Sequence, residues 1–183
     1  MVDSKVDGWV RRVANYNEYR DMIEDAYFYA YNDPDASYHY GIHKTVVNFR
    51  RNQDGLVQET VFQNTNGFPV CNREFGFARE VKTFDHRGFV VNVENFDDKR
   101  IRTGLCVFKW NEENGLVEQL YREGLVNGQR MVEKTEFVYS SEEQGSVVCR
   151  VEQNGQMMTE RRVPVSEVRQ MSLNLNRRQP CKY

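Results

Sequence analysis

Two absences limit what this sequence can do: it has no large excess of either charge and no long apolar run. Its 183 residues include 25 Lys and Arg and 27 Asp and Glu, for a formal net charge of −2, so no positive field gathers polyanions. The apolar runs last only a few residues, whereas a membrane-spanning helix needs roughly 20, and the opening MVDSKVDG lacks the apolar core of a secretory signal. We therefore expect no nucleic-acid or membrane partner and a cytoplasmic location, or the plastid stroma if the source is an alga.

Metal-binding and hydrolase motifs are also lacking. The four cysteines (Cys71, Cys106, Cys149 and Cys181) stand singly, without the C-x-x-C spacing of a zinc site or redox pair. Neither H-E-x-x-H nor G-x-S-x-G occurs. Three of the cysteines lie in apolar stretches, where a free thiol behaves as a small buried hydrophobe. The sequence thus predicts no metal and no permanently bound cofactor.

One stretch has the periodicity of a helix. Between Asn15 and Tyr31, apolar and aromatic residues recur at intervals of three and four, as on one face of an α-helix. Pro34 follows in a turn cluster and forbids continuation. We therefore predict a helical insertion near the N-terminus.

From His43 onward the period changes to two, which is typical of strands. Short β-rich segments alternate with turn dipeptides that suit tight hairpins, because most contain a glycine able to adopt positive φ. These dipeptides are Asp54-Gly55, Asn66-Gly67, Arg87-Gly88, Asp97-Asp98, Asn114-Gly115, Asn127-Gly128, Gln144-Gly145 and Asn154-Gly155. With a first strand ahead of the helix, the sequence predicts about ten antiparallel strands in an up-and-down order within a single domain, 1–183.

An open sheet of that size would leave two edges free to pair with other chains. Closure removes the edges, so we predict a calycin- or lipocalin-like barrel. A barrel of about ten strands is wider than side chains alone readily fill, and related architectures hold a ligand inside. Arginines on the strands could bind a ligand carboxylate through two parallel hydrogen bonds from the guanidinium group. Arg161 shares the less polar face of the last strand. Most of the others are expected on the solvent face.

Two stretches resemble the T-type phycobiliprotein lyases, which attach linear tetrapyrroles (bilins) to cysteines of light-harvesting proteins. The first runs from Arg79 to Phe96 and ends in Val93-Glu94-Asn95-Phe96, and the second begins at Cys149 and includes the closing segment with Ser172. Gly104-Leu105-Cys106 is similar to the Pro-Gly-Cys of that family. The sequence departs from the family at Asn174, where the family has Asp, and at Asn176, where it has Gly.

The resemblance implies a ten-stranded barrel that binds a bilin as substrate and presents it to a cysteine of a phycobiliprotein subunit, with a possible homodimer. It places the ligand-binding residues at Arg79, Glu94, Cys106, Arg161, Ser172 and Asn174. Arg79 and Arg161 would pair with the two propionates of the bilin. Asn174 would accept hydrogen bonds from pyrrole N–H groups, and we expect Cys106 to be a buried core thiol.

Two alternatives stay open from the residues. Gly8-Trp9 and the following Asn15-Tyr16 resemble the first strand and helix start of intracellular lipid-binding proteins, which implies a carrier of fatty acid or another small hydrophobic ligand without catalysis. The second alternative is a barrel filled by its own Phe and Tyr side chains, which would serve only as an interaction surface. Co-purified lipid would favour the carrier. A protein that responds to neither bilin nor lipid would favour the filled barrel.

Overall fold

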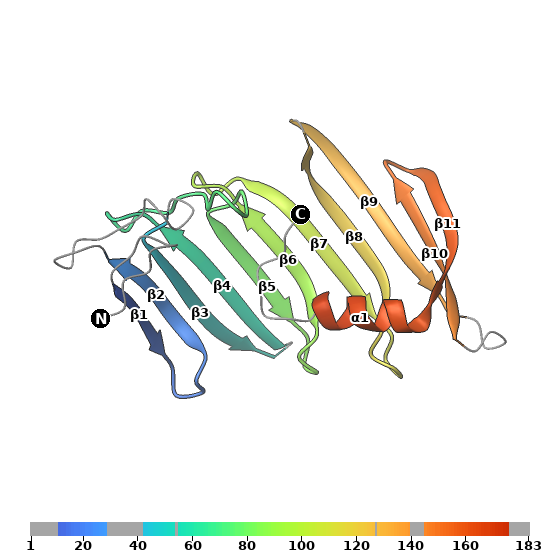
Figure 1. The fold of residues 1–183 in the computed structure, drawn as a ribbon, viewed down its shortest axis with the longest axis horizontal. Coiled ribbons are helices and arrows are strands. Elements are labelled where there is room, and N and C mark those ends of the chain that lie inside the picture. Colours follow the sequence, from blue (N-terminus) through green and yellow to red (C-terminus); the bar gives the residue numbers. More distant parts are fainter. Residues whose placement is uncertain (1–10, 29–41, 54, 127, 140–144, 176–183) are drawn as a thin grey trace.

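The computed structural model describes residues 11–28, 42–53, 55–126, 128–139 and 145–175. They form one antiparallel sheet of eleven strands in sequence order, followed by one helix (Figure 1). The elements are β1 (Arg11–Tyr16), β2 (Met22–Phe28), β3 (Lys44–Asn52), β4 (Gly55–Gln63), β5 (Arg79–Phe84), β6 (Val90–Phe96), β7 (Arg102–Trp110), β8 (Val117–Val126), β9 (Gln129–Val138), β10 (Ser146–Gln153), β11 (Gln156–Pro164) and α1 (Val165–Leu175). The predicted mainly-β, up-and-down architecture is confirmed.

The turn glycines behave as their sequence positions predict. Every glycine in the predicted X-Gly turns has a positive φ, from 66° at Gly115 to 148° at Gly55. At the Asp97-Asp98 turn, which has no glycine, Arg100 takes the positive φ of 67°. Strand boundaries could therefore be read from the spacing of these residues.

Gly55 has a second constraint. A Cβ atom there would clash with the backbone oxygen of Phe84 in the neighbouring hairpin, whereas a Cβ at Gly88, also at positive φ, would meet nothing described within 4 Å. We expect Gly55→Ala to lower the free energy of unfolding by about 3–4 kcal/mol, because it adds a backbone clash to the conformational strain. Gly88→Ala should cost only about 1–2 kcal/mol. Urea denaturation of both variants measures the difference, and equal losses would contradict the clash.

The predicted helix at Asn15–Tyr31 is wrong over the residues that the structure describes, and 29–31 lie outside them. Residues 15–28 contain the end of β1, a turn and β2. The Asn17 Oδ1 atom accepts the backbone N–H groups of Tyr19 and Asp21, each at 2.9 Å, which is the turn chemistry of asparagine. Tyr, Phe and Ile suit strands as well as helices, so the turn decided the structure.

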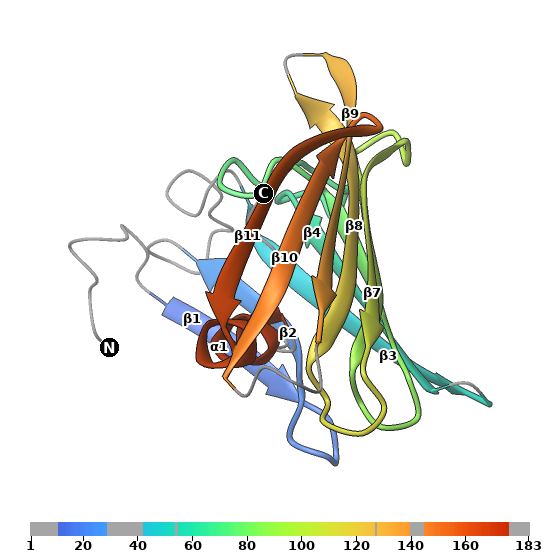
Figure 2. The same cartoon turned by 90° about the vertical axis from the view of Figure 1, so that its right-hand side faces the viewer.

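The predicted closure of the sheet into a barrel is also wrong. β1 and β11 end the sheet and do not pair with each other in the described structure. The sheet is twisted and curved, and α1 lies on its concave side near β8 and β11 (Figure 2). The helix covers apolar surface that closure would otherwise have to cover. The two edge strands carry charge, with Arg11 and Arg12 on β1 and Glu160, Arg161 and Arg162 on β11, and such residues discourage edge-to-edge pairing.

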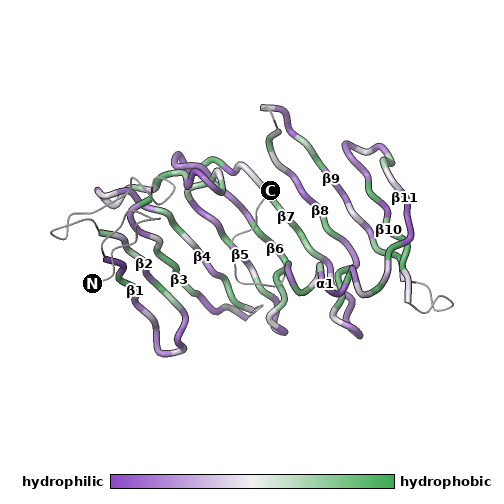
Figure 3. Tube along the Cα trace, viewed as in Figure 1, coloured by the Kyte–Doolittle hydropathy of each residue, from purple (hydrophilic) through white to green (hydrophobic). Residues whose placement is uncertain are grey.

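The apolar core lies under the curve of the sheet. Hydrophobic and hydrophilic positions follow one another along the strands (Figure 3), as expected for a sheet with one buried face. The main core cluster runs from β5 to β11 and includes Phe84, Val93, Phe108, Leu120 and Val168 of α1. The helix is fixed to this core by Ser172, whose Oγ accepts the N–H of Val117 at 3.0 Å and donates to the Val168 carbonyl at 2.8 Å.

Tyr139 packs at the margin of this core and donates its hydroxyl to the Val117 carbonyl oxygen at 2.7 Å. Burial raises the pKa of Tyr139 to about 12, and the charge of Glu118 adds to the rise. The unfolded chain ionises this phenol near pH 10. The stabilisation from Tyr139 is therefore present below pH 10 and lost as the pH rises toward 12.

We expect Tyr139→Phe to be less stable than the wild type at pH 9, with a gap that narrows as the pH approaches 12. Urea midpoints of both proteins at pH 9 and pH 11.5 test this. The other tyrosines and the lysines ionise in both proteins, so their effect on stability cancels in the difference between wild type and Tyr139→Phe. A gap of constant size would contradict the role of the phenolic proton.

Candidate functional site

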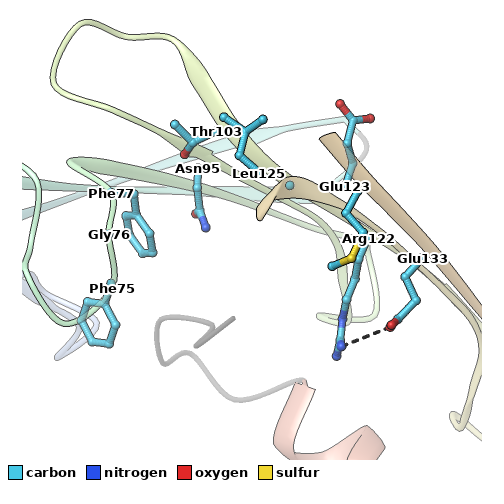
Figure 4. A pocket seen from close by; sticks show the side chains of 12 residues that line it. Phe75, Gly76, Phe77, Asn95, Thr103, Arg122, Glu123, Leu125 and Glu133 are labelled. Carbon is cyan, nitrogen blue, oxygen red and sulfur yellow. Dashed lines mark hydrogen bonds and ion pairs between the residues drawn. The ribbon is translucent and has the colours of Figure 1, made fainter. Parts of the chain in front are cut away.

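Two glycines on neighbouring strands hollow the concave face. Asn95 of β6 is aligned with Gly104 of β7, Gly104 with Gly124 of β8, and Gly124 with Met131 of β9. The two glycines bring no side chain to this row. A cavity of about 490 Å³ lies there (Figure 4). Its lining residues are Phe75, Gly76, Phe77, Asn95, Thr103, Gly104, Arg122, Glu123, Gly124, Leu125, Met131 and Glu133.

One wall of the cavity is aromatic and comes from the segment between β4 and β5. The rings of Phe75 and Phe77 are stacked, with centroids 5.8 Å apart and planes at 20°. Asn72, which is 2 % exposed, holds this segment by accepting the N–H groups of Glu74 at 2.8 Å and Phe75 at 3.3 Å through its Oδ1. The wall is therefore a positioned flat surface.

Arg122 is the basic side chain of this cavity. It belongs to the concave face because it lies opposite Cys106 of β7 and two positions from buried Leu120, on the same face of β8. Its guanidinium Nη1 is 3.5 Å from Oε1 of Glu133, and the Arg122 side chain remains 47 % exposed. An ion pair this long and this exposed is weak. Arg122 can therefore exchange Glu133 for a ligand carboxylate at small cost.

A second cavity of about 330 Å³ lies between the sheet and α1, and Arg122 borders this one as well. Its apolar lining includes Leu120, Phe137, Val163 and Met171. Arg161 stands at its edge, 3.5 Å from Glu167 of α1 in another exposed ion pair. The concave face therefore offers two neighbouring hollows with one arginine between them and one at the far side.

Cys149 lies in the second cavity, opposite Arg161. Burial raises the pKa of its thiol, and the positive charge of Arg161 only partly offsets this effect. Cys106 is 3 % exposed and belongs to the main core. The pKa of Cys149 is therefore shifted in the direction that keeps the thiol protonated, which makes it a poor nucleophile.

Two of the predicted site residues face the other side of the sheet. Arg79 is on the convex face, where its Nε is 2.5 Å from Oε1 of Glu59 and its guanidinium lies over the ring of Phe96 at 4.9 Å. Glu94 is on the same face, 3.3 Å from Arg102. The structure therefore does not bring Arg79 together with Arg161.

The predicted residues on the helix have local partners. Ser172 is buried and bonded to the sheet and to its own helix, as described above. Asn174 is exposed, and its Oδ1 accepts from Gln170 Nε2 at 3.3 Å on the same helix. Of the six predicted residues, Cys106 and Arg161 share the concave face, and their roles toward a ligand stay predictions.

Sequence reasoning missed Arg122 and Asn95 as site residues. Arg122 was one of many arginines on strands, but it lies two positions after Leu120 and so shares its face, and this pattern could have assigned it to the inner face. The pairing of Gly104 with Gly124 depends on strand register, which the sequence alone did not supply. The hollow itself could therefore not be foreseen.

A cluster of buried polar side chains lies on β4 and β5, beside the cavity. Glu80 and Lys82 are 1 % and 2 % exposed in their side chains, and their carboxylate and ammonium groups are 3.1 Å apart. Gln58 and Thr60 lie opposite them on β4 and are buried too. The concave face thus carries a buried polar cluster at β4 and β5.

Among the described residues, no three His, Cys, Asp or Glu side chains gather closely enough to hold a metal ion. In that same part of the chain, no helix is long and apolar enough to span a membrane. Comparison of the chain with protein-family models, with curated proteins and with solved structures finds no match. A function is therefore inferred from the side chains of the concave face.

Proposed function

We propose that the concave face binds a bilin, an extended conjugated molecule with two propionate groups. The observation that carries the proposal is the position of Arg122, which borders both cavities. A guanidinium binds a carboxylate through two parallel hydrogen bonds and keeps its charge when water is excluded. Arg122 and Arg161 would receive the propionates in place of Glu133 and Glu167.

The cavity walls suit a flat conjugated body. Phe75 and Phe77 present stacked rings, and aromatic faces pack well against a planar π-system. The second cavity adds apolar side chains from β8, β9 and α1. This arrangement matches the ligand class implied by the resemblance of Arg79–Phe96 and of the segment from Cys149 to the bilin lyases.

Delivery of the bilin to a phycobiliprotein is part of the proposal. The acceptor's cysteine would add its sulfur to an exocyclic double bond of the bilin, forming one C–S bond while the thiol proton moves to carbon, so no further reactant is needed. This chain would orient the bilin and exclude wrong adducts. Its own thiols take no part in this scheme. The acceptor subunit and a homodimer stay predictions.

Titration of biliverdin with the purified protein tests ligand binding. We expect the visible absorption band to sharpen and shift at micromolar protein. Gly124→Leu is the matched control, because a Cβ at Gly124 would meet no described atom closer than the Thr103 oxygen at 3.9 Å, and the longer side chain would enter the cavity. An unchanged spectrum with the wild type, or the same shift with folded Gly124→Leu, would contradict the proposal.

A carrier of fatty acid is the second candidate, and the apolar second cavity with Arg161 at its edge favours it. Native mass spectrometry of freshly purified protein separates the two. A co-purified fatty acid together with no response to biliverdin would support the carrier. A bilin response that fatty acid does not displace would support the bilin.

A further inference from the structure

The side chain of Asn95 is buried and makes no hydrogen bond within the described structure. The residue is 2 % exposed, and neither Nδ2 nor Oδ1 of its side chain has a partner in the described structure. Buried polar side chains are normally satisfied, because an unsatisfied donor or acceptor forfeits the hydrogen bonds that water gave it. A leucine of similar size would avoid this cost. The amide therefore needs an explanation beyond folding.

The surroundings of Asn95 supply that explanation. It lines the 490 Å³ cavity next to Gly104, on the same side of the ribbon as Phe77 and Arg122 (Figure 4). The flat wall of Phe75 and Phe77 stands beside it. An unsatisfied carboxamide, a stacking surface and a cavity thus occur together. A planar ring that carries its own donor and acceptor would use all three.

We propose that Asn95 recognises the cyclic amide of a terminal bilin ring, and this inference rests on the proposed function. The carboxamide offers one donor and one acceptor side by side. A lactam offers the complement, so Nδ2 would donate to the lactam oxygen while Oδ1 would accept the lactam N–H. A carboxylate has no N–H for Oδ1, and a hydrocarbon chain has neither group. Asn95 therefore binds the lactam of the terminal ring, and Arg122 binds a propionate of the same ligand.

Two ligands and two variants test the pairing. Biliverdin has a lactam at each end, whereas protoporphyrin IX has the same two propionates on a flat conjugated body without a lactam. We expect Asn95→Leu to weaken biliverdin binding about tenfold to a hundredfold and to leave protoporphyrin binding unchanged. Asn92→Leu is the control, since Asn92 lies two residues from Glu94 on the convex side of the same strand and also has a buried unpartnered oxygen.

A stability measurement separates recognition from a structural role. We expect the melting temperature of ligand-free Asn95→Leu to equal or exceed that of the wild type, because an unsatisfied amide is removed. Asn95→Ala provides the same binding comparison where the leucine variant does not fold. Equal losses for biliverdin and protoporphyrin, or a destabilised protein with normal biliverdin affinity, would overturn the role of Asn95. Absence of biliverdin binding by the wild type would instead refute the proposed function.

Discussion

Lys82→Met is expected to lower the free energy of unfolding by about 3–5 kcal/mol, the usual cost of breaking a buried ion pair from one side. The substitution keeps the four-atom stem of the side chain but removes the ammonium group 3.1 Å from Glu80. Glu80 is 1 % exposed, so its carboxylate cannot recover this interaction from water. A loss of this size is a large part of the stability of a single domain. Guanidinium denaturation measures it.

The double variant Lys82→Met/Glu80→Leu is the control for this prediction. Replacing both charges by apolar groups also removes the carboxylate that loses its ammonium partner in the single variant, and such exchanges are often neutral. We expect the double variant to regain most of the lost stability. If it is as unstable as Lys82→Met alone, the loss comes from packing and not from the charge of Glu80.

Arg122→Gln is expected to weaken biliverdin binding about tenfold to a hundredfold, since it removes a charged hydrogen-bond fork from a propionate. Its stability should change little, because the pair with Glu133 is long and exposed. Absorption titration of the folded variant gives the dissociation constant. Among the described residues, Arg122 is the arginine that lines both cavities.

Arg79→Gln is the matched control. It distinguishes the site that the structure indicates from the site that the resemblance implies. The resemblance places Arg79 in the ligand site, whereas the structure pairs it with Glu59 on the convex face. We expect Arg79→Gln to bind biliverdin with wild-type affinity. If Arg79→Gln loses as much affinity as Arg122→Gln, the concave face is not the whole binding site.

The sequence predicted strands and turns because these depend on neighbouring residues. Alternation marked the strands, and positive φ at glycines such as Gly67 and Gly155 marked the hairpins. The prediction of a helix at Asn15–Tyr31 was wrong because aromatic residues spaced at three and four positions are also compatible with two strands around an asparagine turn. The prediction of a closed barrel was wrong because closure depends on what covers the concave face. The helix at Val165–Leu175, which covers part of that face, was not predicted.

The site was harder to predict because it depends on which face each side chain takes. The inward position of Arg161 was expected from its apolar neighbours and agrees with its place at the second cavity. Arg79 was chosen by resemblance, yet it alternates with Glu80 and Lys82, which take the buried face of β5. The cavity arises from two glycines that are distant in sequence and adjacent only in the sheet.

The central claim is that arginines of the concave face hold the propionates of a bilin, and esterification tests it most directly. Biliverdin and its dimethyl ester share the conjugated body and both lactams but differ in the two carboxylates. We predict that the wild type binds the ester at least about tenfold more weakly, and that Arg122→Gln/Arg161→Gln binds both forms with equal, low affinity. Equal affinity of the wild type for biliverdin and its ester would contradict the account.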